Sequence, residues 1–286
     1  MTLSHRQKQP AETVRRIYRQ LSRAWGPQHW WPAESAFEVI VGAVLTQNTS
    51  WINVERAMAN LRAADALHLA AIRSLAVADL EQLIRPSGYF RQKAARLKDF
   101  VAFVDASHAG SLQAMLATPT PQLREQLLAQ RGIGPETADS ILLYAGQHPV
   151  FVVDAYTRRV LERHDAVAAS GRYDDIRELV ELALQAEPPP PASDTEPLHA
   201  NRPAVHAPSA MSTAARANRV QVFNEMHGLF VQLGKHFCSK RAPKCETCPL
   251  GGMLTHPVGD IAPAVSRRAA SLANQAAPRK RAKPRV

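Results

Sequence analysis

The stretch Leu128-Ala129-Gln130-Arg131-Gly132-Ile133-Gly134-Pro135-Glu136-Thr137-Ala138-Asp139 decides the fold. Residues 122–130 have helical periodicity, two glycines then permit backbone angles that side chains disfavour, and Pro135 suits the first position of a new helix. The second helix is expected over residues 136–145, because apolar side chains recur there at helical spacing. The sequence therefore predicts a helix, a tight hairpin and a second helix.

The glycine-rich turn is suited to hold a phosphate. Its backbone N–H groups are little shielded by side chains and lie at the N-terminus of the second helix, where anions are stabilised. Such a contact positions a protein on DNA without reading the base sequence. An ordinary corner between two helices would use the same glycines, so Gly-x-Gly alone leaves that alternative open.

A carboxylate follows the second helix closely. Asp154 comes directly after the apolar segment Phe151-Val152-Val153 and before a predicted helix that carries Arg158 and Arg159. An aspartate in this position is expected to cap the helix, which holds the carboxylate rigid and ionised. A rigid carboxylate can also stabilise the positive charge that develops on a sugar during glycosidic cleavage. The two roles are compatible.

Several short motifs in this order resemble the helix-hairpin-helix (HhH-GPD) DNA glycosylases of the endonuclease III type. The motifs are Leu45-Thr46-Gln47-Asn48-Thr49, Gly132-Ile133-Gly134, Thr137-Ala138, Val153-Asp154-Ala155-Tyr156-Thr157 and a downstream cysteine cluster. The resemblance spans residues 12–185 and 220–250. It implies an all-α protein of two domains, with DNA and an extruded base in the cleft between them.

The same resemblance assigns roles to individual residues. Asp154 aligns with the catalytic aspartate of the family, and Gln47 with a glutamine near the wedge that fills the gap in the DNA. The hairpin residues that the resemblance places on DNA are Gly132, Ile133, Gly134 and Thr137.

One departure from the family pattern bears on the chemistry. Bifunctional members carry a lysine at the position of Glu136, whose amine attacks the sugar and forms a Schiff base before the strand is nicked. A glutamate cannot form that imine, so the nucleophile of a lyase is missing at its expected place and a monofunctional, hydrolytic glycosylase is expected. Glu136 is assigned to the substrate pocket, with a solvent-facing carboxylate in the first turn of its helix as the expected placement.

Tandem tryptophans suggest which base is removed. Trp30 and Trp31 precede Pro32 and an apolar helix that begins near Phe37. An aromatic slot would bind an alkylated, cationic purine by stacking and cation–π attraction. The pattern from Trp30 to Thr49, together with Glu136, is similar to the 3-methyladenine glycosylase branch, which implies an alkylated purine as substrate. Both tryptophans could equally be anchors in the core or between domains.

The chain has only three cysteines, Cys238, Cys245 and Cys248. Their odd number and close spacing favour a metal over a disulfide framework. The family pattern has a fourth cysteine where Leu254 stands, and four such thiolates ligate a [4Fe–4S] cluster. An iron–sulfur cluster is expected, with His256 as a candidate fourth ligand; a zinc site with three cysteines and one histidine, or a site without metal, are the alternatives.

The charge of the chain favours a polyanionic partner. The net charge is +10 and the pI is about 9.9. Residues 257–286 hold seven Lys/Arg and one acidic residue, and they are expected to form a disordered basic tail. Three basic side chains near the cysteines are also expected to contact phosphates, namely Lys240, Arg241 and Lys244. Double-stranded DNA with a damaged base is the expected partner, and the protein is expected to be a monomer.

Helical periodicity dominates the chain and convincing period-two strands are absent, so an all-α fold is expected. Residues 1–35 should form a helix that packs with the C-terminal domain, and residues 36–148 a helical barrel domain. Residues 149–256 should form the cysteine-cluster domain. The proline-rich segment 186–218 has few apolar anchors and is expected to be a disordered insertion in that domain.

No apolar run approaches membrane length, and Met1 to Lys8 do not have the pattern of a secretory signal. A cytoplasmic, nucleoid-associated enzyme is therefore expected. The leading hypothesis is a monofunctional glycosylase of base excision repair. The alternatives are a glycosylase/lyase for oxidised pyrimidines that uses another amine, and a non-catalytic DNA-binding protein that retains the hairpin.

Overall fold

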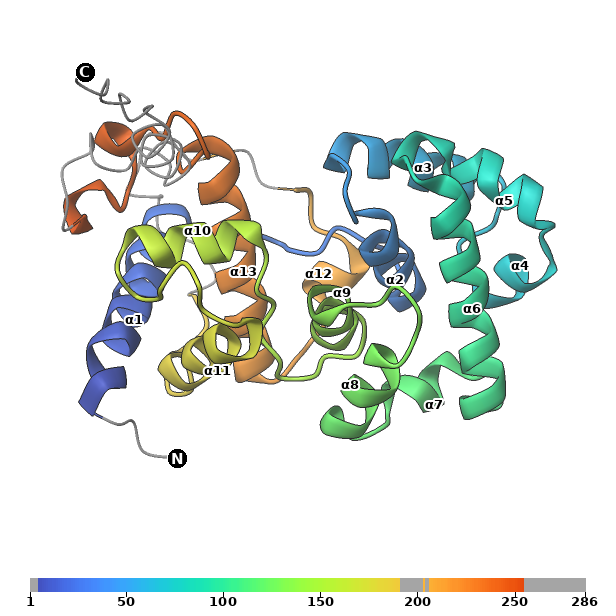
Figure 1. Ribbon diagram of the computed structural model, residues 1–286, viewed down its shortest axis with the longest axis horizontal. Helices are drawn as coiled ribbons and strands as arrows, with labels where there is room; N and C mark the ends of the chain where they lie inside the picture. Colours follow the sequence, from blue (N-terminus) through green and yellow to red (C-terminus); the bar gives the residue numbers. More distant parts are fainter. Residues whose placement is uncertain (1–4, 191–202, 204–205, 255–286) are drawn as a thin grey trace, which may run out of the picture.

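The computed structural model describes residues 5–190, 203 and 206–254, and its elements are helices with no strand among them (Figure 1). The predicted all-α fold is confirmed. Within these residues no helix is both long and apolar enough to cross a bilayer. The predictions for His256 and for the basic tail 257–286 fall outside the described residues.

The helices lie in two groups (Figure 1). The larger group contains α2 (Ala36–Leu45), α3 (Trp51–Ala63), α4 (Leu69–Ser74), α5 (Val77–Ile84), η1 (Arg85–Ser87), α6 (Phe90–His108), α7 (Leu112–Leu116), α8 (Thr120–Leu128), α9 (Pro135–Ser140) and η2 (Ile141–Ala145). The other group contains α1 (His5–Trp25), α10 (Ala155–Arg163), α11 (Tyr173–Ala183), α13 (Asn218–His236), η3 (Cys245–Thr247) and η4 (Gly251–Met253).

The N-terminal helix α1 packs against α11 and α13, far from it in sequence. Its apolar side chains recur at helical spacing, and Val14, Ile17 and Leu21 are fully buried. Two contacts join α1 to the segment that follows α11. Arg19 pairs with Glu187 at 2.6 Å, and the Tyr18 hydroxyl donates to the Pro188 carbonyl at 2.9 Å. The segment after α11 therefore lies against the N-terminal helix.

Helix α2 forms the centre of the larger group. Every residue from Phe37 to Leu45 is buried, which matches a sequence that is apolar apart from Glu38. The Ser35 hydroxyl caps the helix by accepting from the Glu38 backbone N–H at 3.2 Å. Helix α2 contacts α6, α9 and η2, so it supports the hairpin from within the core.

The segment expected to be disordered, 186–218, differs from that expectation over residues 206–217. A short helix, α12 (Ala210–Thr213), begins at Ser209, whose side chain accepts from the Ser212 backbone N–H. The Met211 N–H donates to the Ala33 carbonyl at 3.0 Å, and the Ala33 N–H donates to the Ser209 hydroxyl at 3.2 Å. These paired bonds anchor the end of the segment beside the tryptophans, which composition alone does not reveal.

Candidate functional site: a helical hairpin beside a capped aspartate

The hairpin between α8 and α9 forms as the sequence predicts. Gly132 has φ +80°, and a Cβ there would overlap the Arg96 side chain, so both the backbone angle and the space require glycine. Gly134 caps α9 with φ −92°, and a Cβ there would meet nothing within 4 Å. The Ile133 side chain is buried, and its N–H donates to the Gln130 carbonyl at 3.1 Å. The exposed residues of the turn are Arg131 and the two glycines.

Gln47 joins the loop after α2 to this hairpin. Its Nε2 donates to the Gly132 carbonyl at 3.0 Å and to Thr137 Oγ1 at 2.8 Å, while its Oε1 accepts from Arg96. Thr137 is itself buried. The two residues hold the shape of the turn through these bonds.

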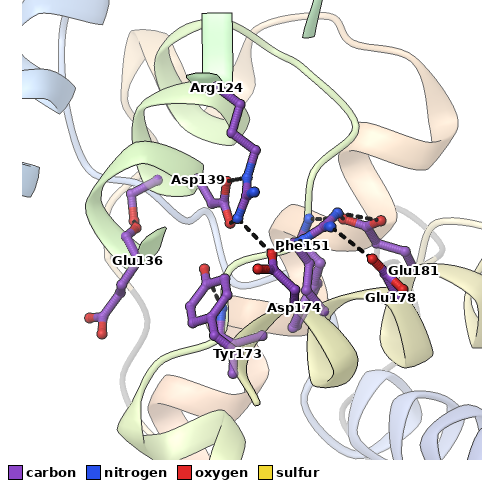
Figure 2. A network of polar contacts seen from close by, with 11 residues as sticks. Arg124, Glu136, Asp139, Phe151, Tyr173, Asp174, Glu178 and Glu181 are labelled. Atoms are coloured by element: carbon purple, nitrogen blue, oxygen red, sulfur yellow. Dashed lines mark hydrogen bonds and ion pairs between the residues drawn. The ribbon is translucent and has the colours of Figure 1, made fainter. Parts of the chain in front are cut away.

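A buried ionic network ties the hairpin to α11 (Figure 2). Arg124 on α8 donates to both carboxylate oxygens of Asp139 on α9, at 2.7 and 3.1 Å, and to Asp174 on α11 at 2.9 Å. Asp139 is fully buried. Burial raises the pKa of the Asp139 carboxyl, and the Arg124 guanidinium opposes that rise. The network therefore fixes the hairpin relative to the second group of helices.

Side chains of α11 also hold the backbone that leads to Asp154 (Figure 2). The Phe151 N–H donates to Glu181 Oε1 at 2.9 Å, and the Val153 N–H donates to the Tyr173 hydroxyl at 3.2 Å. Arg177 binds both oxygens of Glu181 at 3.0 Å. Because side chains of α11 hold the backbone at Phe151 and Val153, Asp154 has a defined position at the start of α10.

Asp154 caps α10, as predicted from the sequence. Its Oδ1 accepts from the Thr157 backbone N–H at 2.7 Å. Its Oδ2 lies 3.7 Å from Nε2 of His227 on α13. The other ring nitrogen of His227, Nδ1, is hydrogen-bonded to the Tyr144 hydroxyl. The sequence alone does not identify His227 or Tyr144. The one local signal is that His227 is a histidine within a buried and largely apolar stretch of α13.

Glu136 lies in the first turn of α9 and is exposed, as expected. Its side chain points away from the Arg124–Asp139 pair (Figure 2). Surrounding protein and, to a smaller extent, the Asp154 charge raise the pKa of Glu136 to about 7. The pKa of Glu136 in the larger group of helices thus responds to the charge of Asp154, which precedes α10 in the other group.

Trp30 and Trp31 are both buried and form an aromatic cluster with Trp51. The ring centroids of the three pairs are 5.2 to 5.9 Å apart. Trp31 packs on α2, since its ring lies 3.2 Å from where a Cβ of Gly42 would be. The Trp30 ring centroid lies 6.4 Å from that of His227 and 5.8 Å from Lys235 Nζ. The Trp31 ring centroid lies 5.3 Å from that of Tyr144, so both tryptophans adjoin the Tyr144–His227 pair.

The three cysteines are free thiols that line one cavity in the loop after α13. The Arg163 guanidinium donates to Cys238 Sγ at 3.1 Å, and the Leu250 N–H donates to Cys248 Sγ at 3.4 Å. His164 lines the same cavity, and its Nδ1 is buried without a hydrogen-bond partner. Within the described residues no three Cys, His, Asp or Glu side chains are close enough to hold one metal ion.

The basic side chains predicted to reach phosphates lie in the same loop, and Lys240, Arg241 and Lys244 are exposed. Arg163 holds the backbone of the loop from inside by donating to the carbonyls of Ser239 at 2.9 Å and Lys240 at 3.3 Å. The charges therefore project from a backbone that is fixed.

An all-helical fold that presents a glycine hairpin beside a capped aspartate and a basic loop defines a helix-hairpin-helix DNA-binding protein. The model of the HhH-GPD superfamily, described as base excision DNA repair proteins, matches residues 41–185. The chain belongs to this family. It is a DNA repair glycosylase.

Three relatives support this assignment. A Methanocaldococcus jannaschii protein, named as a member of the DNA repair glycosylases, is 38% identical over 241 residues, which is 84% of this chain and 94% of that protein. The Thermotoga maritima endonuclease III is 24% identical and covers 74% of this chain and 79% of its own length. The H. pylori 3-methyladenine DNA glycosylase, solved with 1,N6-ethenoadenine bound, has 29% identity, a TM-score of 0.59, and coverage of 79% of this chain and 97% of that one.

A trapped covalent intermediate of endonuclease III with DNA has a TM-score of 0.62 at 17% identity, and it covers 89% of this chain and 97% of that chain. At this identity the likeness concerns the fold. The predicted membership of the endonuclease III-like glycosylases is thus confirmed on both sequence and structure.

Proposed function

We propose that this protein is a monofunctional DNA glycosylase, which hydrolyses the bond between a damaged base and its deoxyribose. The observation that supports the proposal is the pair of carboxylates: Asp154 is held rigid as a helix cap, and Glu136, which the resemblance aligns with the lysine of a lyase, lies within the influence of the Asp154 charge. A carboxylate can stabilise a cation and orient water, but it cannot form an imine.

Asp154 would act as the bond to the base breaks. Positive charge develops on the deoxyribose when the C1′–N bond lengthens, and the base leaves with the bonding electron pair. The carboxylate stabilises that charge and orients the water whose oxygen bonds to C1′. The proton lost by the water passes to the carboxylate or to solvent. The strand is left intact with an abasic site.

An alkylated purine is the proposed substrate. The 29% identical H. pylori structure belongs to a 3-methyladenine glycosylase. An alkylated purine is cationic and leaves readily, so it needs little acid catalysis and is bound well by aromatic faces. The partly exposed Trp51, which packs against Trp30 and Trp31, would offer such a face, and Trp30 links this cluster to His227 beside Asp154.

Base release from defined duplexes tests the catalytic proposal. Wild-type protein is expected to release methylated purines, and Asp154→Asn is expected to lose this activity by at least about a hundredfold while it still binds the duplex. Asparagine accepts the helix-cap bond, so the fold should be kept. Equal release by both proteins would contradict the role of Asp154.

Borohydride trapping tests the monofunctional assignment separately. Because Glu136 has no amine, no covalent protein–DNA adduct is expected with a damaged or abasic duplex. An adduct would show that another amine attacks the sugar, which would make the protein a lyase. Binding without release from any substrate would favour the non-catalytic alternative.

We also propose that the three cysteines ligate an iron–sulfur cluster. Three thiols and the unpartnered Nδ1 of His164 line one cavity, and thiolate sulfur is the usual ligand of such clusters. When bound, the cluster would crosslink the basic loop to α10 and α13.

Visible absorption, together with iron, sulfide and zinc analysis of protein purified without oxygen, tests the cluster. Iron and sulfide are expected in about equal amounts, with little zinc. His164→Ala and His256→Ala form a matched pair, since loss of absorption in one but not the other identifies the fourth ligand. Protein that contains neither metal would refute the proposal.

A further inference from the structure

We propose that His227 is a positioning residue, which fixes the Asp154 carboxylate by donating a hydrogen bond from Nε2 while the Tyr144 hydroxyl holds its other ring nitrogen. This inference rests on the proposed role of Asp154. It concerns three residues that are far apart in sequence and that the fold brings together from η2, α10 and α13.

The first support is an unpartnered polar atom aimed at the site. His227 is buried in the middle of α13, and its Nε2 has no hydrogen-bond partner. That atom lies 3.7 Å from Asp154 Oδ2, which is slightly too long for a hydrogen bond. Buried polar groups are normally satisfied, and hydrogen bonds in active sites are often long without substrate and shorten in the complex.

The second support is that the surroundings select one tautomer. Burial raises the pKa of Tyr144, so the phenol keeps its proton. Burial also lowers the pKa of His227, although the Asp154 charge opposes this shift, so the imidazole stays neutral. A carboxylate repels a nitrogen lone pair and attracts an N–H, so the single imidazole proton belongs on Nε2. Nδ1 is then an acceptor, and the Tyr144 hydroxyl donates to it.

The arrangement restrains both oxygens of the carboxylate. Oδ1 accepts from the Thr157 N–H, and Oδ2 would accept from His227, so rotation about the bond to the carboxyl group is blocked. Each oxygen has a second acceptor site, which leaves room for water or for the cationic sugar. A neutral donor suits this purpose better than lysine or arginine, because it orients the carboxylate without cancelling its negative charge.

Single-turnover base release with two substitutions at His227 tests the proposal. In His227→Gln the side-chain amide can place an N–H close to where Nε2 lies, whereas His227→Leu removes the donor and keeps an apolar side chain. We expect release to slow by about 10- to 100-fold in His227→Leu, with duplex affinity unchanged, and to stay near the wild-type rate in His227→Gln. Equal rates for all three folded proteins, or equal losses in both variants, would overturn it.

A second measurement does not depend on turnover. ¹⁵N NMR of the imidazole rings reports which nitrogen carries the proton, and the His227 signals are identified by their loss in His227→Gln. We expect a neutral ring with the proton on Nε2, a signal that shifts in Asp154→Asn, and partial loss of that tautomer in Tyr144→Phe. A proton on Nδ1 would overturn the proposal even if His227→Leu failed to fold.

The failure of this inference is distinguishable from failure of the proposed function. If Asp154→Asn still releases bases, the glycosylase mechanism itself is wrong, whatever His227 does. If Asp154→Asn is inactive while folded His227→Leu and Tyr144→Phe turn over like wild type, only the positioning role of His227 is wrong.

Discussion

Single residues in this protein perform opposite tasks according to their surroundings. Gly132 is required by its backbone angle and by Arg96, whereas Gly134, two residues later, faces open space. Among the carboxylates, Asp154 serves as a helix cap, whereas Glu225 is buried in α13 and accepts from the Gln28 N–H and the Gln221 side chain. Residue type alone therefore does not tell which position is structural, and substitutions must be chosen from the contacts.

Gly134→Asp should separate binding from folding. An aspartate is favourable at a helix N-cap and φ −92° is open to it, so stability should be unchanged or slightly raised. The new carboxylate would face DNA phosphates, so affinity should fall by about tenfold or more for damaged and undamaged duplexes alike. Fluorescence anisotropy measures this, with Gly134→Asn as the uncharged control. A loss confined to one lesion would contradict a backbone grip on phosphate.

Glu225 should make stability depend on pH. Burial raises the pKa of Glu225 to about 7, although the Gln28 N–H and Arg216 oppose the rise. A carboxyl whose pKa is higher in the folded than in the unfolded protein stabilises the folded state in its protonated form. That stabilisation is complete below the unfolded pKa and is lost as the pH rises through about 7. The change in the free energy of unfolding that Glu225→Gln causes should therefore be more favourable at pH 8 than at pH 5, by about 2 kcal/mol.

Urea unfolding at the two pH values measures this difference. Glu136 has a raised pKa in the same range, so the test compares variants rather than the wild-type curve alone. The exposed Glu162 provides the control, and Glu162→Gln should leave the pH dependence as it is. A Glu225→Gln curve parallel to that of wild type would show that this carboxyl does not titrate in the folded protein as described.

At the scale of elements, the hairpin is held to the second group of helices by charge as well as by apolar packing. Arg124 is the one side chain that bonds α8 to both α9 and α11 in the network of Figure 2. Asp139 depends on it, because a buried carboxylate needs a partner. The orientation of the glycine turn relative to Asp154 thus depends on Arg124, which lies in α8.

Arg124→Leu should destabilise the protein by about 3 to 5 kcal/mol, since it leaves the buried Asp139 charge unpaired. Adding Asp139→Asn should recover part of that loss because it removes the charge. The exposed Arg91, 3.8 Å from the partly buried Glu81, offers a control in which Arg91→Leu costs less than about 1 kcal/mol. Chemical denaturation measures all three, and equal effects of Arg124→Leu and Arg91→Leu would contradict the role of the network.

For the whole molecule, the parts that sequence predicts are those coded over short distances. Helical periodicity, the glycine turn before Pro135 and the cap at Asp154 each depend on a few neighbouring residues, and all three are present in the structure. The match with the HhH-GPD family confirms the predicted fold. Local spacing is thus sufficient for the elements and their order.

The remaining parts depend on contacts between distant residues. His227 meets Tyr144 across 83 positions, and His164 shares a cavity with cysteines 74 to 84 positions away. No spacing rule connects such residues, so sequence reasoning proposed His256 from its closeness in the chain. The burial of Trp31 on α2 is likewise a matter of tertiary packing, which an apolar pattern does not reveal.

The anchored ends of the segment between α11 and α12 have a consequence for how the chain can change. Pro188 is held by Tyr18, and Ser209 and Met211 are held by Ala33, so the two ends are fixed independently of what connects them. Closing a connection between fixed points costs only about 0.6 kcal/mol for each doubling of its length. Insertions there should be nearly neutral in evolution, and a fluorescent protein or affinity tag placed between residues 191 and 202 should leave both groups of helices as they are.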